Sequence, residues 1–425
     1  MSAIFIAVLL GQTLDIPHHR FTLASNGLEV IVSRDVRTPV VAVNVWYKTA
    51  ATTDYPIGFA HALRYSMLRA TADGAPLFEI LAAAGARDAF GSVSLDRTTY
   101  FETMPRAQLD TALWVEAQRM LGADGALDPD VLTRDRRALR EERRRLEREP
   151  YAQSTEAVFN TLFPDDHPYQ GFALAPSARI EQFDASKLRT YHRAAYSPSN
   201  ATLTIVGDVD METIHARVLR HFGSIPARVA LEPARSNATE LASERRVRVA
   251  ELVPNARIQI GWRTPPAFSA ESTVAELLAE LLAAAPEGKL RETLGESASD
   301  VFASQQALAQ ASAFTLGAVA APNAAIGAIE TAIDNMLETI SREPFSPEEV
   351  SQASERLVLE SLKDLERASG RAEAFNRHHR VAKNADAINH SLKRFDEVSP
   401  EELMQFARRW LRRDRRVVVI TTVRQ

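Results

Sequence analysis

The feature that most constrains the fold of this chain is an order of predicted elements that occurs twice along its 425 residues. In the first half, strands are predicted at 28–32 and 40–47, since β-branched residues are frequent there and the second segment alternates with period two. The elements expected after them are helices at 58–67 and 78–84, a hairpin of 90–95 and 98–104, helices at 107–121, 129–148 and 185–195, and a strand at 201–206.

The second half follows a similar order. Its expected elements are strands at 247–252 and 258–262, a helix at 271–285, strands within 300–310 and 313–319, helices at 323–341, 347–366 and 400–411, and a strand at 417–422. Ser346 and Glu349 form a capping-box pattern at the start of one of these helices. The repetition predicts two homologous α+β domains, at 17–226 and 246–425, joined by a linker at 227–245.

The composition excludes several classes of function. Apolar residues make up 45% and charged residues 25%, as in a globular protein. A net charge of −5 argues against nucleic-acid binding, and the basic clusters at 134–148 and 408–416 are interleaved with acids or lie on predicted helices, which indicates solvated faces. The chain has no cysteine, which excludes thiol catalysis and leaves only His, Asp and Glu as zinc ligands.

Residues 1–16 are expected to be a leader. Their apolar run at 3–10 has the length of a signal-peptide core, although no Lys or Arg precedes it and no A-x-A cleavage site follows. The run is too short to span a bilayer, so no transmembrane segment is expected. We therefore favour an exported protein, periplasmic or extracellular; the alternatives for the segment itself are a disordered leader and an edge strand.

The helix at 58–67 carries three polar side chains, His61, Arg64 and Tyr65, at positions i, i+3 and i+4 of one face. The zinc-binding pattern H-x-x-E-H uses this geometry, with two histidines as ligands and the glutamate as general base. Here the first histidine is kept. Arg64 stands at the position of the base and Tyr65 at the position of the second ligand.

The surrounding residues resemble the pitrilysin/insulinase family of metallopeptidases, which includes the mitochondrial processing peptidases. In that family a glycine precedes the motif, as Gly58 does, and a third ligand, a glutamate, follows about 75 residues later. Glu142 lies 142 − 65 = 77 positions after Tyr65. Further matches are Asn26-Gly27-Leu28, Asp96 to Tyr100, His167-Pro168-Tyr169, and Tyr196 to Ala201 followed by Val206-Gly207-Asp208.

The resemblance therefore covers nearly the whole chain, and it implies a particular architecture. Each half would be an antiparallel sheet backed by helices, and the two halves would form a clamshell. In two-chain members of the family, four such domains enclose a proteolytic chamber.

The departures from the motif predict that the metal chemistry has been lost. A catalytic zinc needs about three protein ligands and a base beside its water, and only His61 and Glu142 remain at the expected positions. Arg64 would place a permanent charge there and cannot accept a proton, and the phenol of Tyr65 is a poor ligand. We predict no cofactor, and an ion pair between Arg64 and Glu142 at the metal position.

The second domain departs from the family as well. Related proteins use an Arg and a Tyr there, in a context similar to R-L-x-x-x-L followed by A-Y. The matching positions here are Lys289 and Ser299, which keep only the charge of the first residue and lose the aromatic ring of the second. They are our candidates for substrate binding.

These observations favour a catalytically silent subunit that pairs with an active paralogue, as a heterodimer or larger assembly, and binds peptide substrates at exposed sheet edges. An alternative is an atypical zinc metalloendopeptidase that uses His61, Glu142 and a third ligand not recognised in the sequence. Another is a scaffold subunit similar to the core subunits of the respiratory bc₁ complex, which share this fold.

Overall fold

The computed structural model describes residues 14–48, 58–122, 126–164, 167–170, 183–228, 241–284 and 287–424. Most of the expected leader and the centre of the expected linker therefore lie outside the described residues. Two compact units are formed. Unit 1 comprises Met1–Arg143, Ala173–Ala234 and Leu362–His390, and unit 2 comprises Arg144–Phe172, Arg235–Ser361 and Ser391–Gln425.

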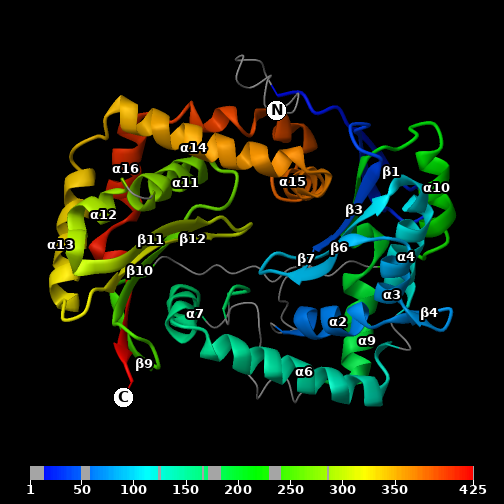
Figure 1. Cartoon of the computed structure of the whole chain (residues 1–425), viewed down its shortest axis with the longest axis horizontal. Helices are drawn as coiled ribbons and strands as arrows, with labels where there is room; N and C mark the ends of the chain where they lie inside the picture. The colour runs from blue at the N-terminus through cyan, green and yellow to red at the C-terminus, as the bar shows by residue number, and fades with distance from the viewer. Residues whose placement is uncertain are drawn as a thin grey trace. The chain divides into compact units, whose positions relative to one another are not determined.

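Unit 1 contains a six-stranded sheet with the order β1-β2-β8-β3-β7-β6 (Figure 1). Its strands are β1 (His19–Thr22), β2 (Glu29–Arg34), β3 (Val40–Lys48), β6 (Arg87–Val93), β7 (Arg97–Pro105) and β8 (Ala201–Gly207). Its helices are α2 (Phe59–Leu68), α3 (Leu77–Ala83), α4 (Leu109–Leu121), α9 (Ala185–Ala195), α10 (Ile214–Phe222) and α15 (Ala368–Arg380), together with most of α6 (Pro129–Arg148). A short β4–β5 hairpin (Thr71–Ala72 and Ala75–Pro76) lies between α2 and α3.

Strand β3 lies between β8 and β7 and is buried on both faces. Val41, Val43 and Val45 belong to the apolar core that α2, α3, α4, α9 and α10 complete. On the opposite face, the side-chain amide of Asn44 accepts a 3.0 Å hydrogen bond from Asn376 of α15. Helix α15 belongs to the second half of the sequence, so one face of the unit 1 sheet is covered by a distant segment.

Unit 2 contains a five-stranded sheet with the order β11-β12-β10-β13-β9. Its strands are β9 (Arg245–Glu251), β10 (Arg257–Thr264), β11 (Ala298–Gln306), β12 (Ser312–Ala320) and β13 (Val417–Val423). Its helices are α7 (Ala152–Leu162), α11 (Ala270–Ala283), α12 (Lys289–Leu294), α13 (Ile326–Ile340) and α16 (Pro400–Trp410), and α14 (Pro347–Glu366) lies mostly in this unit.

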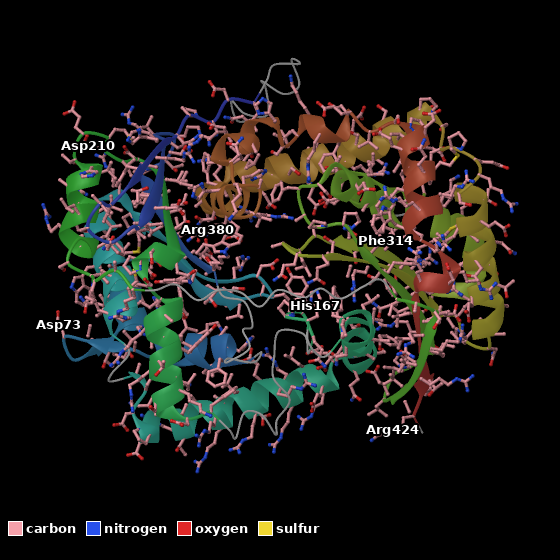
Figure 2. The ribbon with its side chains drawn as sticks, turned by 180° about the vertical axis from the view of Figure 1, so that it is seen from behind. Asp73, His167, Asp210, Phe314, Arg380 and Arg424 are labelled. Carbon is pink, nitrogen blue, oxygen red and sulfur yellow. The ribbon has the colours of Figure 1, made fainter. Side chains whose placement is uncertain are left out.

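The unit 2 sheet is also covered on both faces. Trp262 and Phe314, the latter labelled in Figure 2, are buried in a core formed with α11, α13 and α16. On the other face, α7 approaches so closely that a Cβ atom on Gly261 would lie 2.7 Å from the side chain of Val158. Helix α7 comes from the first half of the sequence.

The predicted α+β class is confirmed, and the antiparallel expectation needs a correction. Each sheet contains one parallel pair, β2 with β8 and β9 with β13. The order β2-β8-β3-β7-β6 corresponds to β9-β13-β10-β12-β11, and the parallel pair stands at the same place in both. This agreement supports duplication, which stays a prediction, as do the boundaries at 227–245.

Most of the expected elements are present. The Ser346–Glu349 capping box is formed, with the Glu349 amide 3.2 Å from the Ser346 hydroxyl. In the described part of the chain, seven strands and α-helices are not among those that the sequence analysis predicts: β1, β4, β5, α7, α10, α12 and α15. Among the described residues, no helix is long and apolar enough to cross a membrane.

Candidate functional site

Helix α2 begins at a position that requires glycine. Gly58 has a φ of 105°, in the left-handed region where a side chain would be strained. The helix then places His61 and Arg64 on a buried side, where they are 9% and 8% exposed. The predicted common face of His61, Arg64 and Tyr65 is thus present on this helix.

Arg64 forms the predicted ion pair with Glu142 of α6. Its Nη2 atom lies 3.3 Å from Oε2 and 3.5 Å from Oε1 of the carboxylate. Its Nη1 atom donates to the backbone carbonyl of Gly91 in β6 at 3.3 Å, and its buried Nε has no hydrogen-bond partner among the described residues. One guanidinium therefore contacts both α6 and the edge strand β6.

His61 lies on the other side of the same carboxylate. Its Nε2 atom is 3.7 Å from Oε1 of Glu142, which is longer than a hydrogen bond. The Glu142 side chain is 22% exposed, so this cluster lies near the surface of unit 1 rather than deep in its core. The structure thus brings together His61, Arg64 and Glu142 as the sequence predicted.

The donor set at this position does not fit a catalytic zinc. A zinc site requires about three protein ligands at roughly 2.0–2.3 Å and an open position for water. Here two potential ligands face a guanidinium that would repel a divalent cation at short range. Among the described residues, no group of three or more His, Cys, Asp or Glu side chains could hold a metal ion.

The hydroxyl group of Tyr65 makes no hydrogen bond to any described residue. Its ring is half-buried against the unit 1 core and lies 5.2 Å from the guanidinium carbon of Arg64. The guanidinium carbon of Arg69 lies 5.7 Å from the same ring. Tyr65 therefore supports the position of Arg64 through cation–π contacts.

A buried carboxylate that the sequence analysis missed fixes α2 against α6. The Ser66 hydroxyl donates a 2.6 Å hydrogen bond to Oδ2 of Asp135, whose side chain is 1% exposed. Burial raises the pKa of Asp135, although the Ser66 hydrogen bond acts in the opposite direction. Asp135 precedes Glu142 by seven residues, about two helical turns, and that spacing on one face was the available signal.

A second buried network lies beside α2. Nη1 of Arg119 donates to the Met67 carbonyl at 2.8 Å, and Nε of Arg119 donates to Glu116 at 3.1 Å. Burial and the neighbouring Glu116 carboxylate raise the pKa of Glu102 well above its usual range. Burial also raises the pKa of Tyr100 to about 12.

The two candidates for substrate binding lie in unit 2, and both are engaged internally. Lys289 at the start of α12 is 3.0 Å from carboxylate oxygens of both Glu292 and Glu349. The Ser299 hydroxyl donates to the backbone carbonyl of Val319 at 3.3 Å. Their role in substrate binding stays a prediction.

Comparisons with known proteins agree with the fold. The family described as Peptidase M16 inactive domain matches residues 182–357, a stretch that begins after Glu142 and does not include α2. The zinc protease PqqE of Helicobacter pylori is 23% identical over 427 residues, which cover 96% of this chain and 94% of that protein. The mitochondrial-processing peptidase subunit beta of Lentinula edodes is 24% identical over 272 residues, 59% of this chain and 56% of its own.

A solved structure gives the same result. The crystal structure of a protease from Helicobacter pylori superposes with a TM-score of 0.87 at 22% identity, covering 96% of this chain and all 100% of that one. The resemblance predicted from the sequence is therefore confirmed over almost the full length.

Proposed function

Because this chain is a relative of the M16 peptidases, we propose that it is a catalytically silent member that binds peptides and pairs with an active paralogue. The observation that carries the proposal is the guanidinium of Arg64 on the Glu142 carboxylate, 3.3 Å away. This arrangement puts a fixed cation at the position where the motif H-x-x-E-H has its general base, beside the metal that the motif binds.

Arg64 disfavours hydrolysis in two ways. A general base must accept a proton from the attacking water, and a guanidinium, which stays protonated in proteins, does not. A nearby positive charge also raises the cost of placing a divalent metal ion beside Glu142, since the two cations repel each other. Peptide binding needs neither a general base nor a metal ion.

The edge strand β6 supports the peptide-binding part of the proposal. It is the last strand of the unit 1 sheet, so one of its backbone edges is unpaired within the sheet. An extended peptide can add to such an edge by main-chain hydrogen bonds. Phe90 is 53% exposed, and its ring packs edge-on to that of Phe101 at 5.9 Å, which provides an apolar contact for a peptide side chain.

A zinc-dependent peptidase is the second candidate. It is favoured by the 3.7 Å approach of His61 to Glu142, since two ligand types of a zinc site are already adjacent. A third ligand and movement of Arg64 would both be required.

Elemental analysis and peptide assays on the purified full chain separate these functions. The proposal predicts zinc well below one equivalent, no cleavage of an unfolded peptide, and saturable binding of the same peptide in fluorescence anisotropy. Native mass spectrometry after mixing with a paralogue that has an intact H-x-x-E-H motif tests the pairing. One tightly held zinc, with cleavage abolished by His61→Ala, would instead establish the second candidate.

A further inference from the structure

Three strands of the unit 1 sheet have their carboxyl ends at the same end of the sheet. Strand β2 is parallel to β8, and β3 is antiparallel to both β8 and β7, so β2, β8 and β7 run in one direction. Their last residues are Arg34, Gly207 and Pro105. The segments that follow the carboxyl ends of these strands therefore meet outside one end of the sheet.

A cavity of about 620 Å³ lies at this end of the sheet. Its volume falls within the range of about 300–1,000 Å³ that is typical of small-molecule sites. It is lined by residues from β2, the segment after β7, the segment after β8, and the beginnings of α4 and α10: Arg34, Arg106, Ala107, Leu109, Asp208, Val209, Asp210, Met211, Glu212 and Arg217. Asp210, labelled in Figure 2, marks its position beside α10.

Two of the three arginines that line the cavity, Arg34 and Arg217, make no side-chain hydrogen bond to a described residue. The side chain of Arg34 makes no hydrogen bond or ion pair with any described residue. Arg217 lies 3.8 Å from Asp110, which is too long for a hydrogen bond, and its charge contributes to the lowered pKa of Asp210. Arg106 is paired with Asp208 at 2.6 Å, but its side chain is 63% exposed and also lines the cavity.

The carboxylates of the lining are mostly committed to protein groups. Asp208 is held by Arg106. Asp210 accepts a 3.0 Å bond from the Glu212 amide and a 2.8 Å bond from the Thr213 hydroxyl. Glu212 is the exception, since its carboxylate has no partner among the described residues, and it opposes an anion in the cavity.

We propose that this cavity binds a small ligand through an oxyanion, either a carboxylate or a phosphate. Guanidinium groups present paired N–H donors that match the two oxygens of such groups. Arg34 and Arg217 would supply the contacts, and the apolar side chains of Val209 and Met211 would contact the body of the ligand. This site belongs to unit 1 alone and is independent of the proposed peptide-binding function.

Isothermal titration of the full chain tests the proposal, with inorganic phosphate and succinate as separate probes and sodium chloride at equal ionic strength as reference. We expect saturable binding of at least one probe. Arg34→Gln and Arg217→Gln should each weaken it about tenfold, because each removes a charge-assisted hydrogen bond. Glu212→Gln should strengthen it by removing a repulsive charge.

Arg220→Gln is the matched control, because Arg220 is an exposed arginine of α10 that does not line the cavity. Its binding should equal that of the unaltered chain, and circular dichroism should show that all of the variants are folded. The proposal is wrong if neither probe binds, or if Arg220→Gln weakens binding as much as Arg34→Gln does. The probe that binds more tightly identifies the ligand as a phosphate or a carboxylate.

Discussion

Arg64 of α2 and Glu142 of α6 are 78 positions apart, and Nη2 of the arginine lies 3.3 Å from Oε2 of the glutamate. The Arg64 side chain is 9% exposed and the Glu142 side chain 22% exposed, so solvent screens the pair only in part. The contact therefore joins two helices of unit 1 at the positions that the resemblance assigns to the general base and to the third metal ligand.

Removing Arg64 should destabilise unit 1. Arg64→Ala takes the guanidinium away from the Glu142 carboxylate, and we expect a loss of about 1–3 kcal/mol in the free energy of unfolding, measured by urea denaturation. Arg145→Ala, on an exposed position of α6, should cost less than about 0.5 kcal/mol. The coupling energy is the change for the double variant Arg64→Ala/Glu142→Ala minus the changes for the two single variants. A coupling energy of zero would show that the pair does not contribute to stability.

Restoring the motif should restore a metal site. In Arg64→Glu/Tyr65→His, two histidines at i and i+4 would join Glu142 as ligands, and the introduced glutamate would replace the repulsive cation. We expect close to one zinc per chain by elemental analysis after extensive dialysis. The control Arg64→Gln/Tyr65→Phe removes the same two side chains without adding ligands, and it should remain metal-poor. Equal zinc in both variants would contradict the inferred geometry.

The buried carboxyl of Glu102 should make stability depend on pH. Burial and the Glu116 carboxylate raise the pKa of Glu102 in the folded chain, whereas in the unfolded chain its pKa is about 4.3. The folded state then binds the proton more tightly, so this contribution is complete below the unfolded pKa and is lost as pH rises through the folded pKa. The measurement is the free energy of unfolding by urea denaturation between about pH 5 and 8. Glu102→Gln should reduce the slope of this free energy against pH.

The exposed Glu296→Gln is a suitable control for that experiment, because Glu296 lies on the surface of unit 2. Its slope should match that of the unaltered chain. A Glu102→Gln variant with the original slope would show that another group causes the dependence.

The attachment of α15 to unit 1 depends on polar contacts. Asn376 is fully buried, donates to Asn44 at 3.0 Å and accepts a 2.8 Å bond from the Thr204 hydroxyl. Asn376→Leu should remove the acceptor of Thr204 and one donor to Asn44, and cost about 1–3 kcal/mol, the usual penalty for a buried polar group that loses its partner. Faster amide hydrogen exchange confined to α15 would locate the loss. Unchanged exchange and stability would show that the amide network is dispensable.

Helix α15 also shows which part of the fold the sequence pattern could not provide. Its buried residues include Arg371 and Asn376 beside Ala372 and Phe375, so no apolar periodicity marks the helix. In contrast, the sequence predicts α6 at its observed bounds, 129–148, because Asp128 and Pro129 mark its start.

The candidate site divides in the same way. His61, Arg64 and Glu142 could be assigned from motif spacing, which depends on side-chain identity. The Gly91 carbonyl that Arg64 also contacts is a backbone group in another strand, and its position depends on the tertiary arrangement of β6 beside α2. No residue type at position 91 could have indicated it.

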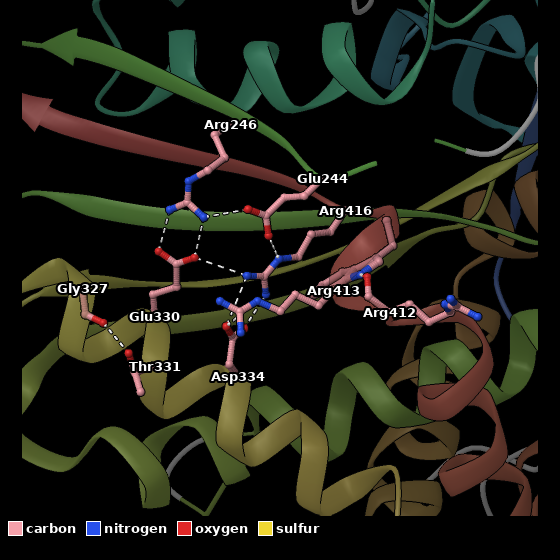
Figure 3. Close-up of polar contacts among 10 residues, drawn as sticks. Glu244, Arg246, Gly327, Glu330, Thr331, Asp334, Arg412, Arg413 and Arg416 are labelled. Atoms are coloured by element: carbon pink, nitrogen blue, oxygen red, sulfur yellow. Dashed lines mark hydrogen bonds and ion pairs between the residues drawn. The ribbon is translucent and has the colours of Figure 1, made fainter. Parts of the chain in front are cut away.

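Arg416 in unit 2 should be the most important cation for the stability of that unit. Its side chain is 1% exposed, its Nε lies 2.7 Å from Glu244, and its Nη2 lies 3.2 Å from Glu330 (Figure 3). It also contacts Asp334. Arg416→Met takes the buried cation away from these carboxylates, and we expect a loss of about 3–5 kcal/mol in urea unfolding.

The matched control is Arg412→Met in the same segment, because Arg412 is 47% exposed and its ion pair is with Asp414, which is itself exposed. It should cost at most about 1 kcal/mol. The Arg246 hydrogen bond and, to a smaller extent, the charge of Arg416 lower the pKa of Glu330, so the stability that this carboxylate provides is present above its unfolded pKa and is lost as pH falls through its folded pKa. Arg416→Met should therefore also reduce the part of the unfolding free energy that is lost at acid pH. If Arg416→Met and Arg412→Met lose equal stability, burial of Arg416 contributes nothing beyond a surface ion pair.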